Sequence, residues 1–485
     1  MARTAQAPTA PSTAAPALPT WAVWANPTAE IVLAGASIAG LLALLVSQAP
    51  VWNAEPKLPP GPGQAVANSL GWPAIALSLG FLIALCLPFR PYALGIAAAR
   101  RAHSTRVLLG AAAAVAVVAL LMYPAYGSDM FMYVAFERLW TVYGENPLVA
   151  LTSAHPGDWA YAFVWVTGTP NPYGPVWVLL SWPIVQLAGT SAIGLVVGYK
   201  LIALCSYLAC CVLIWSSLPP AERASRVVLF AWSPLVLFEG LGKAHNDLVL
   251  AVAALAAVRL GARGGMLAAT AGALVKLSGL AVLPALAVPL VRERRWAALA
   301  AGAGAAAALA TLAYAPFWEG PGTLTAVGMQ ISWNWWSPAA LAIAAGLDAA
   351  LVRITLTAVC IGVTLLILLR VRDPATASAG VYLAALLLLT SHFFAHYLVP
   401  VVALAALSPN RALRRSVLAL SLGAMAAYAV DPLQLAMPAG WAGSPAYQIL
   451  GSVVLIGPLV ALWVSEMRNG RHSSARSRPD GAAPA

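Results

Sequence analysis

The chain has 485 residues, of which 61% are hydrophobic and only 9% are charged. Soluble globular proteins carry about 25% charged residues, so this composition excludes a soluble protein built around one large core. The net charge of +11 does not indicate nucleic-acid binding, because the arginines stand beside apolar segments, as in the cytoplasmic loops of membrane proteins. The sequence therefore predicts an all-α polytopic membrane protein whose partner is the lipid bilayer.

The chain begins with residues 1–28, which are rich in Ala, Pro and Thr and are predicted to form a disordered cytoplasmic tail. Apolar blocks of about 18 to 25 residues follow, and each is expected to be helical because lipid cannot satisfy backbone polar groups. We expect a helical bundle of about 13 crossings. The candidate segments are residues 30–49, 70–88, 106–125, 173–190, 192–216, 226–240, 247–262, 264–291, 296–316, 349–369, 376–391, 395–408, 414–430 and 447–465.

These segments divide the chain into five regions. They are the tail 1–28, an N-terminal transmembrane helix pair at 29–105, a central transmembrane module at 106–346, C-terminal transmembrane helices at 347–467, and a basic cytoplasmic tail at 468–485. The central module contains a large loop at 126–172, and its residues 130–142 are expected to form an amphipathic helix lying on the membrane.

Arginine-rich connections predict the orientation, because basic loops remain in the cytoplasm. These connections are Arg90–Arg106, Arg292–Arg295, Arg370–Asp373 and Arg411–Arg415, and the loop 126–172 is then external. Two places do not fit this rule simply.

The first is 173–216, where two spans would put Arg223 and Arg226 outside, unless one of the two segments is re-entrant or interfacial. The second lies between Arg263 and Arg292, which is too long for one straight span and too short for two. A broken helix around Lys276 is expected there, lining a cavity.

Asp129 directly follows an apolar segment and lies at the start of the external loop. A carboxylate in this position can act as a general base, a role that contributes about 10²- to 10⁴-fold to a rate. A helix cap or a solvated loop acid would also explain it, so position alone leaves these interpretations open.

Polar residues cluster in Gly242–Asp247, between two apolar segments, and include His245, Asn246 and Asp247. A charged group at the bilayer centre costs about 2.5 to 3.5 kcal/mol, so we expect these side chains to face a wet cavity, although a solvated loop would also fit. Lys276 stands alone in an apolar block, where a buried ammonium group would favour an anion such as phosphate.

His392 and His396 are four residues apart and would share one helix face. No acid accompanies them, so a zinc site is not expected; binding of a phosphate or sugar hydroxyl, or packing of His392, is favoured. The segment Ser332–Pro338 places three tryptophans around Asn334, which suits either sugar stacking or anchoring at the membrane interface.

Several different polar and aromatic motifs lie at the ends of apolar segments. They are Asp129, Tyr143–Leu148, Asn171–Pro175, Trp232–Glu239, His245–Asp247, the segment around Lys276, Ser332–Pro338 and His396–Tyr397. In this order they resemble the GT-C superfamily of membrane glycosyltransferases. Within it they are similar to the bacterial polyprenyl-phosphate-mannose-dependent alpha-1,6-mannosyltransferases that elongate lipoglycans. The resemblance covers residues 106–465.

The resemblance implies a GT-C bundle in the plasma membrane that transfers mannose from a polyprenyl-phosphate donor to a lipid-linked glycan acceptor. Transfer would occur on the external face with inversion, and Asp129 would be the catalytic base. The residues implied to bind the donor are Lys276, His245, Asn246, Asp247, His396 and Tyr397. Those implied to stack on sugar or acceptor are Tyr173, Trp333, Asn334 and Trp335.

No cofactor is implied, because a phosphate leaving group does not require a metal, and only His245 and Asp247 could offer ligands if a divalent ion were used. The alternative interpretation is a transporter or flippase for a lipid-linked or anionic substrate. Such a protein also needs polar residues in a membrane cavity, but it usually places them near the midplane.

Overall fold

A computed structural model of the chain describes residues 79–80, 82–101, 105–122, 129–164, 168–326, 336–390, 392–430, 441 and 444–476. Within these residues the regular elements are all helices, which confirms the predicted class. The predicted tail 1–28, the segment 30–49 and most of 70–88 lie outside the described residues. The predicted C-terminal tail is helical as far as the end of α20 (Pro445–Arg476).

Six helices in the described part are long and apolar enough to cross a membrane. They are Leu82–Ala99, which includes α4 (Phe89–Ala99); α8 (Ala192–Ser217); Trp296–Phe317, which begins with α13 (Trp296–Tyr314); α16 (Ala349–Arg370); Arg411–Val430, which begins with α19 (Arg411–Ala427); and Pro445–Met467 within α20. A seventh forms if α9 (Pro220–Ala231) and the π-helical segment η4 (Val236–Gly242), which are bent by 64°, count as one span.

The predicted count of about 13 crossings is not confirmed, because several apolar helices are short. α17, for example, has 15 residues, and at 1.5 Å per residue it is about 23 Å long, against a hydrocarbon core of about 30 Å. α17 covers Pro374–Leu388. The other short apolar helices include α5 (Thr105–Leu121), α7 (Pro175–Ala188), and η10 (Ala395–Leu398) followed by α18 (Val399–Leu407).

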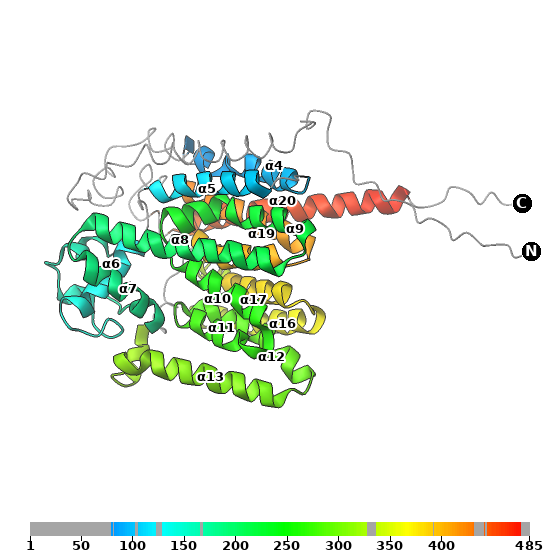
Figure 1. The fold of residues 1–485 in the computed structure, drawn as a ribbon. Helices are drawn as coiled ribbons and strands as arrows, with labels where there is room; N and C mark the ends of the chain where they lie inside the picture. Colours follow the sequence, from blue (N-terminus) through cyan, green and yellow to red (C-terminus); the bar gives the residue numbers. More distant parts are fainter. Residues whose placement is uncertain are drawn as a thin grey trace, which may run out of the picture.

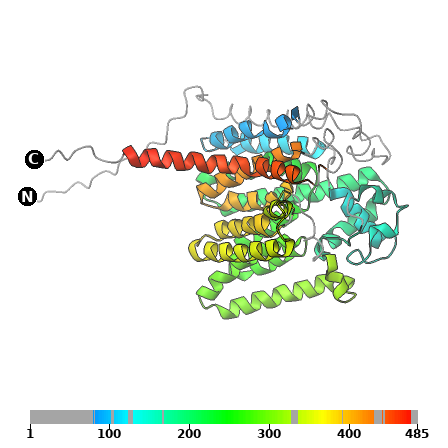
Figure 2. The same cartoon turned by 180° about the vertical axis from the view of Figure 1, so that it is seen from behind.

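The helices lie side by side in a bundle, with a lobe at one end that contains α6 (Asp129–Thr141) and α7 (Figure 1). Seen from behind, α20 extends beyond the bundle at the opposite end (Figure 2). Near the centre, α10 (Asp247–Leu260) packs against α8, α11 (Gly265–Ala273) and α18. All residues of α18 are buried, so the core of the bundle lies around α10 and α18.

The arginine-rich connections meet at the end of the bundle opposite the lobe. Arg226 and Arg414 both donate hydrogen bonds to the carbonyl oxygen of Ser408. Arg292 donates a hydrogen bond of 2.6 Å to the carbonyl oxygen of Leu368, which joins the connection before α13 to the end of α16. The connection before α9 therefore lies with the other basic connections, as the charge rule requires.

The position of α7 explains how the chain reaches this end. α7 packs against α6 in the lobe and does not run along the bundle (Figure 1), and it exposes Leu179, Leu180, Trp182 and Leu187. For residues 173–216 the sequence allowed either two spans or one span with an interfacial or re-entrant segment. The exposed apolar side chains of α7 suit an interfacial segment. A single crossing by α8 then brings the chain to Arg223.

The helix break expected around Lys276 is confirmed. α11 ends just before it, Lys276 itself is extended with φ −152° and ψ 130°, and the 3₁₀ segment η6 (Leu277–Val282) leads into α12 (Leu283–Arg292). The carbonyl oxygens of Leu274 and Val275 accept backbone hydrogen bonds of 3.0 Å from the start of α7. These bonds satisfy carbonyl groups that the broken helix leaves free.

Gly174→Ala should destabilise this junction. A Cβ atom at residue 174 would lie 2.1 Å from the carbonyl oxygen of Leu274, and backbone atoms on both sides leave little room for movement. Overpacking of this kind costs about 1–3 kcal/mol, so we expect a lower melting temperature for the detergent-solubilised protein. The matched control is Gly157→Ala, where a Cβ would meet nothing within 4 Å. Equal melting temperatures for the two variants would contradict the role of Gly174.

Helix α6 is buried inside the lobe, whereas the sequence predicted a helix at 130–142 lying on the membrane. Eleven of its 13 residues are buried, because α7, α8 and η3 (Trp159–Phe163) pack around it. Glu137 is one of them, and its Oε1 has no hydrogen-bond partner among the described residues. Burial raises the pKa of Glu137 from 4.5 to about 9.

This raised pKa predicts that stability falls as the pH rises. In the unfolded chain Glu137 loses its proton near pH 4.5, whereas in the folded protein it keeps the proton up to about pH 9. Between these values the folded state loses up to about 1.4 kcal/mol per pH unit relative to the unfolded state. Glu137→Gln should therefore raise the melting temperature most at alkaline pH and flatten its pH dependence. Glu145→Gln, at a side chain that is 40% exposed, should leave the wild-type slope. A wild-type slope in Glu137→Gln would refute the prediction.

Candidate functional site

Asp129 lies in the first turn of α6 and is held by a tyrosine that lies two residues before α7. Its Oδ2 accepts a hydrogen bond of 2.6 Å from the hydroxyl group of Tyr173. Burial, and next the charge of Asp129, raises the pKa of Tyr173 well above its usual range, so the hydroxyl group keeps the proton that it donates. Tyr133 packs edge-on against Tyr173, with ring centroids 4.8 Å apart. Asp129 is thus oriented, while its side chain remains 10% exposed.

Lys276, at the helix break, pairs with Asp247, the first residue of α10. Its Nζ lies 2.9 and 3.2 Å from the two carboxylate oxygens and 4.3 Å from the centroid of the Tyr397 ring. The Asp247 side chain is fully buried, whereas that of Lys276 is 12% exposed. The ion pair compensates a buried carboxylate, and the Lys276 side chain keeps a small exposed area.

A second buried ion pair forms around Glu239 on η4. Its Oε1 lies 3.2 Å from Lys243 Nζ, and its Oε2 lies 3.1 Å from His245 Nδ1. Between these two partners the chain turns through Ala244, whose φ is +57°. This left-handed conformation is unfavourable for a residue other than glycine, and such strain, like π-helical geometry, is often found at functional sites.

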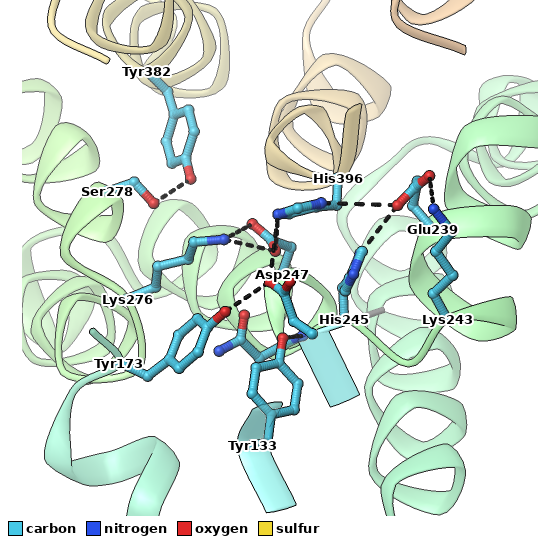
Figure 3. A network of polar contacts seen from close by, with 12 residues as sticks. Tyr133, Tyr173, Glu239, Lys243, His245, Asp247, Lys276, Ser278, Tyr382 and His396 are labelled. Carbon is cyan, nitrogen blue, oxygen red and sulfur yellow. Dashed lines mark hydrogen bonds and ion pairs between the residues drawn. The ribbon is translucent and has the colours of Figure 1, made fainter. Parts of the chain in front are cut away.

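His396 on η10 lies within 4.0 Å of three carboxylates from three different elements, and Figure 3 shows two of them, Glu239 and Asp247. Its Nε2 lies 3.8 Å from Asp129 Oδ2 and 4.0 Å from Asp247 Oδ2, and its Nδ1 lies 3.8 Å from Glu239 Oε2. The centroid of its ring is 4.0 Å from that of His245. Of the predicted residues, Asp129, Asp247 and His396 therefore belong to one continuous cluster, which Lys276 joins through Asp247.

Asn246 places an unpaired amide in this cluster. Its side chain is buried, yet neither its oxygen nor its nitrogen has a hydrogen-bond partner among the described residues. Its backbone N–H donates to the hydroxyl group of Tyr133 at 3.3 Å. Because buried amides are almost always hydrogen-bonded, the free side chain indicates a ligand or a water molecule as its partner.

The cluster offers three kinds of chemistry in surroundings that largely exclude water. Asp129 can accept a proton from a hydroxyl group, and Lys276 can bind an anion. Metal ligands are also available, although in another combination than the sequence suggested. Asp247 is paired with Lys276, whereas Glu239, His245 and His396 each place a ligand atom within 4.8 Å of the others.

The predicted stacking residues Trp333, Asn334 and Trp335 lie outside the described residues. The neighbouring Trp336 is buried, and its backbone N–H donates to the side chain of Gln448. His392 packs beside the cluster, with its ring centroid 5.9 Å from that of Tyr397. Burial, and next the charge of Lys276, lowers its pKa to about 4.

Three buried ionisable residues were not among the predicted site residues. Glu239 and Lys243 are four residues apart in an apolar segment, a spacing that lets an acid and a base pair on one helix face. Lys200 stands alone in α8 and donates hydrogen bonds to the carbonyl oxygens of Met122 and, at 2.8 Å, Gly242. It thereby joins the ends of α5 and η4. Because intramembrane charges are costly, each was a detectable signal.

Comparison with known proteins supports a specific family. The family model described as "Alpha-(1->6)-mannopyranosyltransferase, N-terminal domain" matches residues 29–292, which is more than half of the chain. This range includes Asp129, Glu239, Asp247 and Lys276, and it ends before His396. No curated protein and no solved structure matches the chain. The chain belongs to the family of alpha-1,6-mannopyranosyltransferases.

Proposed function

We propose that this protein transfers mannose from a polyprenyl-phosphate mannose donor to a hydroxyl group of a lipid-linked glycan, forming an alpha-1,6 linkage with inversion. The observation that carries the proposal is that Asp129 and Lys276 lie in one cluster with side chains that are 10% and 12% exposed, whereas the side chains of Asp247 and Glu239 are fully buried. A hydroxyl group attacking a phosphate-linked sugar needs these two functions, a base and a cation for the departing phosphate.

In the proposed reaction Asp129 takes the proton of the acceptor hydroxyl group as its oxygen attacks the anomeric carbon. The bond between that carbon and the phosphate oxygen breaks, and the phosphate leaves with the electron pair. Lys276 and His396 stabilise the negative charge that develops on it. The hydrogen bond from Tyr173 holds the carboxylate of Asp129 in one orientation.

The donor would bind along the same cluster. The free amide of Asn246 can bond to a phosphate oxygen or a sugar hydroxyl, and the ring of Tyr397 lies 4.3 Å from the ammonium group of Lys276. Asp247 would hold Lys276 in place through their ion pair, and His245 would hold the ring of His396. Stacking on the sugar or acceptor is assigned to Tyr173 and to the tryptophan segment 333–335.

The charge rule supports an active site on the external face of the plasma membrane. The basic connections lie at one end of the bundle, and the lobe that carries Asp129 lies at the other (Figure 1). We infer a GT-C architecture with about 13 spans, in which residues 106–346 form the catalytic module, 29–105 an N-terminal helix pair and 347–467 the C-terminal helices.

The test uses the full-length protein in liposomes with an oligomannoside acceptor and a panel of labelled donors. We expect transfer from polyprenyl-phosphate mannose and none from nucleotide-linked mannose, and nuclear magnetic resonance of the product should show the new alpha-1,6 bond. Transfer from the nucleotide donor alone would refute the proposed donor. Movement of the lipid-linked sugar across sealed vesicles without product formation would instead establish a flippase.

A further inference from the structure

We propose that Glu239, His245 and His396 bind one divalent transition-metal ion beside the donor site. Glu239 Oε2 lies 3.1 Å from His245 Nδ1 and 3.8 Å from His396 Nδ1, and the ligand atoms of the three residues lie within 4.8 Å of one another. Ligands at about 2.1 Å from a tetrahedral ion are about 3.4 Å apart. Small side-chain movements would therefore bring the three atoms into one coordination sphere.

The three converging atoms contact one another but form no aligned hydrogen bond. Glu239 Oε2, His245 Nδ1 and His396 Nδ1 are buried, and none has a hydrogen-bond partner among the described residues. The contact of 3.1 Å is close enough for a hydrogen bond but is not aligned for one. A buried polar atom without a partner destabilises the folded state. One metal ion would satisfy all three atoms at once.

The charge of the cluster also favours a cation. The carboxylates of Asp129, Glu239 and Asp247 outnumber the ammonium groups of Lys243 and Lys276 by one. A phosphodiester donor would add a second negative charge, and a divalent ion would neutralise the loaded site. This part of the inference rests on the proposed function, whereas the ligand geometry does not.

Coordination would fix the proton of His396. With Nδ1 bound to the ion, the proton must lie on Nε2, which faces Asp129 and Asp247 at 3.8 and 4.0 Å. The ring would then present an N–H group to the carboxylates of Asp129 and Asp247. Lys243 contacts Oε1 of Glu239, which helps to orient this carboxylate and leaves Oε2 available for the metal ion.

The ligand set restricts the kind of ion. Two imidazoles and one carboxylate suit Zn²⁺, Fe²⁺ or Co²⁺, whereas Mg²⁺ and Ca²⁺ prefer sites made of oxygen atoms alone. Three protein ligands leave at least one coordination position open, as in catalytic rather than structural zinc sites.

The test is a titration of the full-length protein with Co²⁺, after purification without a polyhistidine tag and removal of metal with a chelator. We expect the visible absorption of Co²⁺ bound to nitrogen and oxygen ligands, at one ion per chain. Substitution of a residue that only hydrogen-bonds to a metal ligand typically weakens metal binding about 10- to 100-fold. Loss of a ligand itself, in His245→Ala or His396→Ala, should weaken Co²⁺ binding at least as much. Glu239→Gln keeps the size of the side chain and should have the same effect in a protein with an unchanged chromatographic profile.

The matched control is His155→Ala, because His155 lies in the lobe and pairs with Glu145. It should bind Co²⁺ like the wild type. If the wild type shows no bound Co²⁺, or if His396→Ala binds it equally well, the metal site is refuted. If Co²⁺ binds as expected but the chelator-treated protein transfers mannose at the full rate, the charge-balancing role is refuted. Intact Co²⁺ binding without mannosyl transfer under any condition would support the site and count against the proposed function instead.

Discussion

Asp129→Asn should lower the turnover number for mannosyl transfer by about 10²- to 10⁴-fold, the usual contribution of a general base. The amide cannot take a proton from the acceptor, but it has nearly the same shape and can still accept the hydrogen bond from Tyr173. Donor affinity should therefore change little. The measurement is the initial rate with saturating donor, together with the dissociation constant of the donor for both proteins.

Two further variants separate catalysis from folding. Glu145→Gln makes the same chemical change at an exposed position of the lobe, where Glu145 pairs with His155, and should transfer at the wild-type rate. Tyr173→Phe should cause a smaller loss than Asp129→Asn, because it removes the hydrogen bond that orients the base but leaves the base itself. A wild-type rate in Asp129→Asn would show that this carboxylate is not the base.

Lys276→Met should raise the donor KM by about 10- to 100-fold, which corresponds to about 1.4–2.8 kcal/mol of lost binding. Lys276 is the more exposed of the two lysines in the cluster, at 12% against 2%, and a charge-assisted bond from its ammonium group to phosphate would be lost. The same change leaves the buried carboxylate of Asp247 without its partner, a loss that typically costs about 3–5 kcal/mol of stability. The single variant should thus be defective in both respects.

The double variant Lys276→Met/Asp247→Asn distinguishes the two effects. Removing both charges should restore much of the melting temperature, because no uncompensated carboxylate remains. Donor affinity should stay low, because the cation is still missing. If the double variant recovers both stability and donor affinity, Lys276 serves only to neutralise Asp247, and its phosphate-binding role is wrong.

Much of the architecture could be predicted because long apolar segments that must lie in lipid can adopt few structures. The apolar blocks predicted a helical membrane protein, since lipid permits few other ways to satisfy the backbone. The break at Lys276 was predictable for the same reason: about 28 apolar residues between Arg263 and Arg292 fit neither one span nor two. The number of crossings was not predictable, because α7 is as apolar as a spanning helix and only its packing places it in the lobe.

The site was predictable in its parts and not in its pairing. Asp129, Asp247, Lys276 and His396 stood out because each is a costly residue in or beside an apolar segment. Their sequence separations, however, carry no information on which carboxylate faces which cation. Glu239 ends the motif Trp232–Glu239, and its contacts with Lys243 and His245 could not be predicted from that motif.

The sequence by itself determined the class of this protein and most of its candidate site residues, because the cost of burying charge in lipid restricts where such residues can occur. The tertiary structure alone decided that Lys276 is held by Asp247, that Tyr173 orients Asp129, and that Glu239 meets two histidines. These contacts join residues that are distant along the chain, and they depend on how α10, η4 and η10 pack together, which no local pattern of residues encodes.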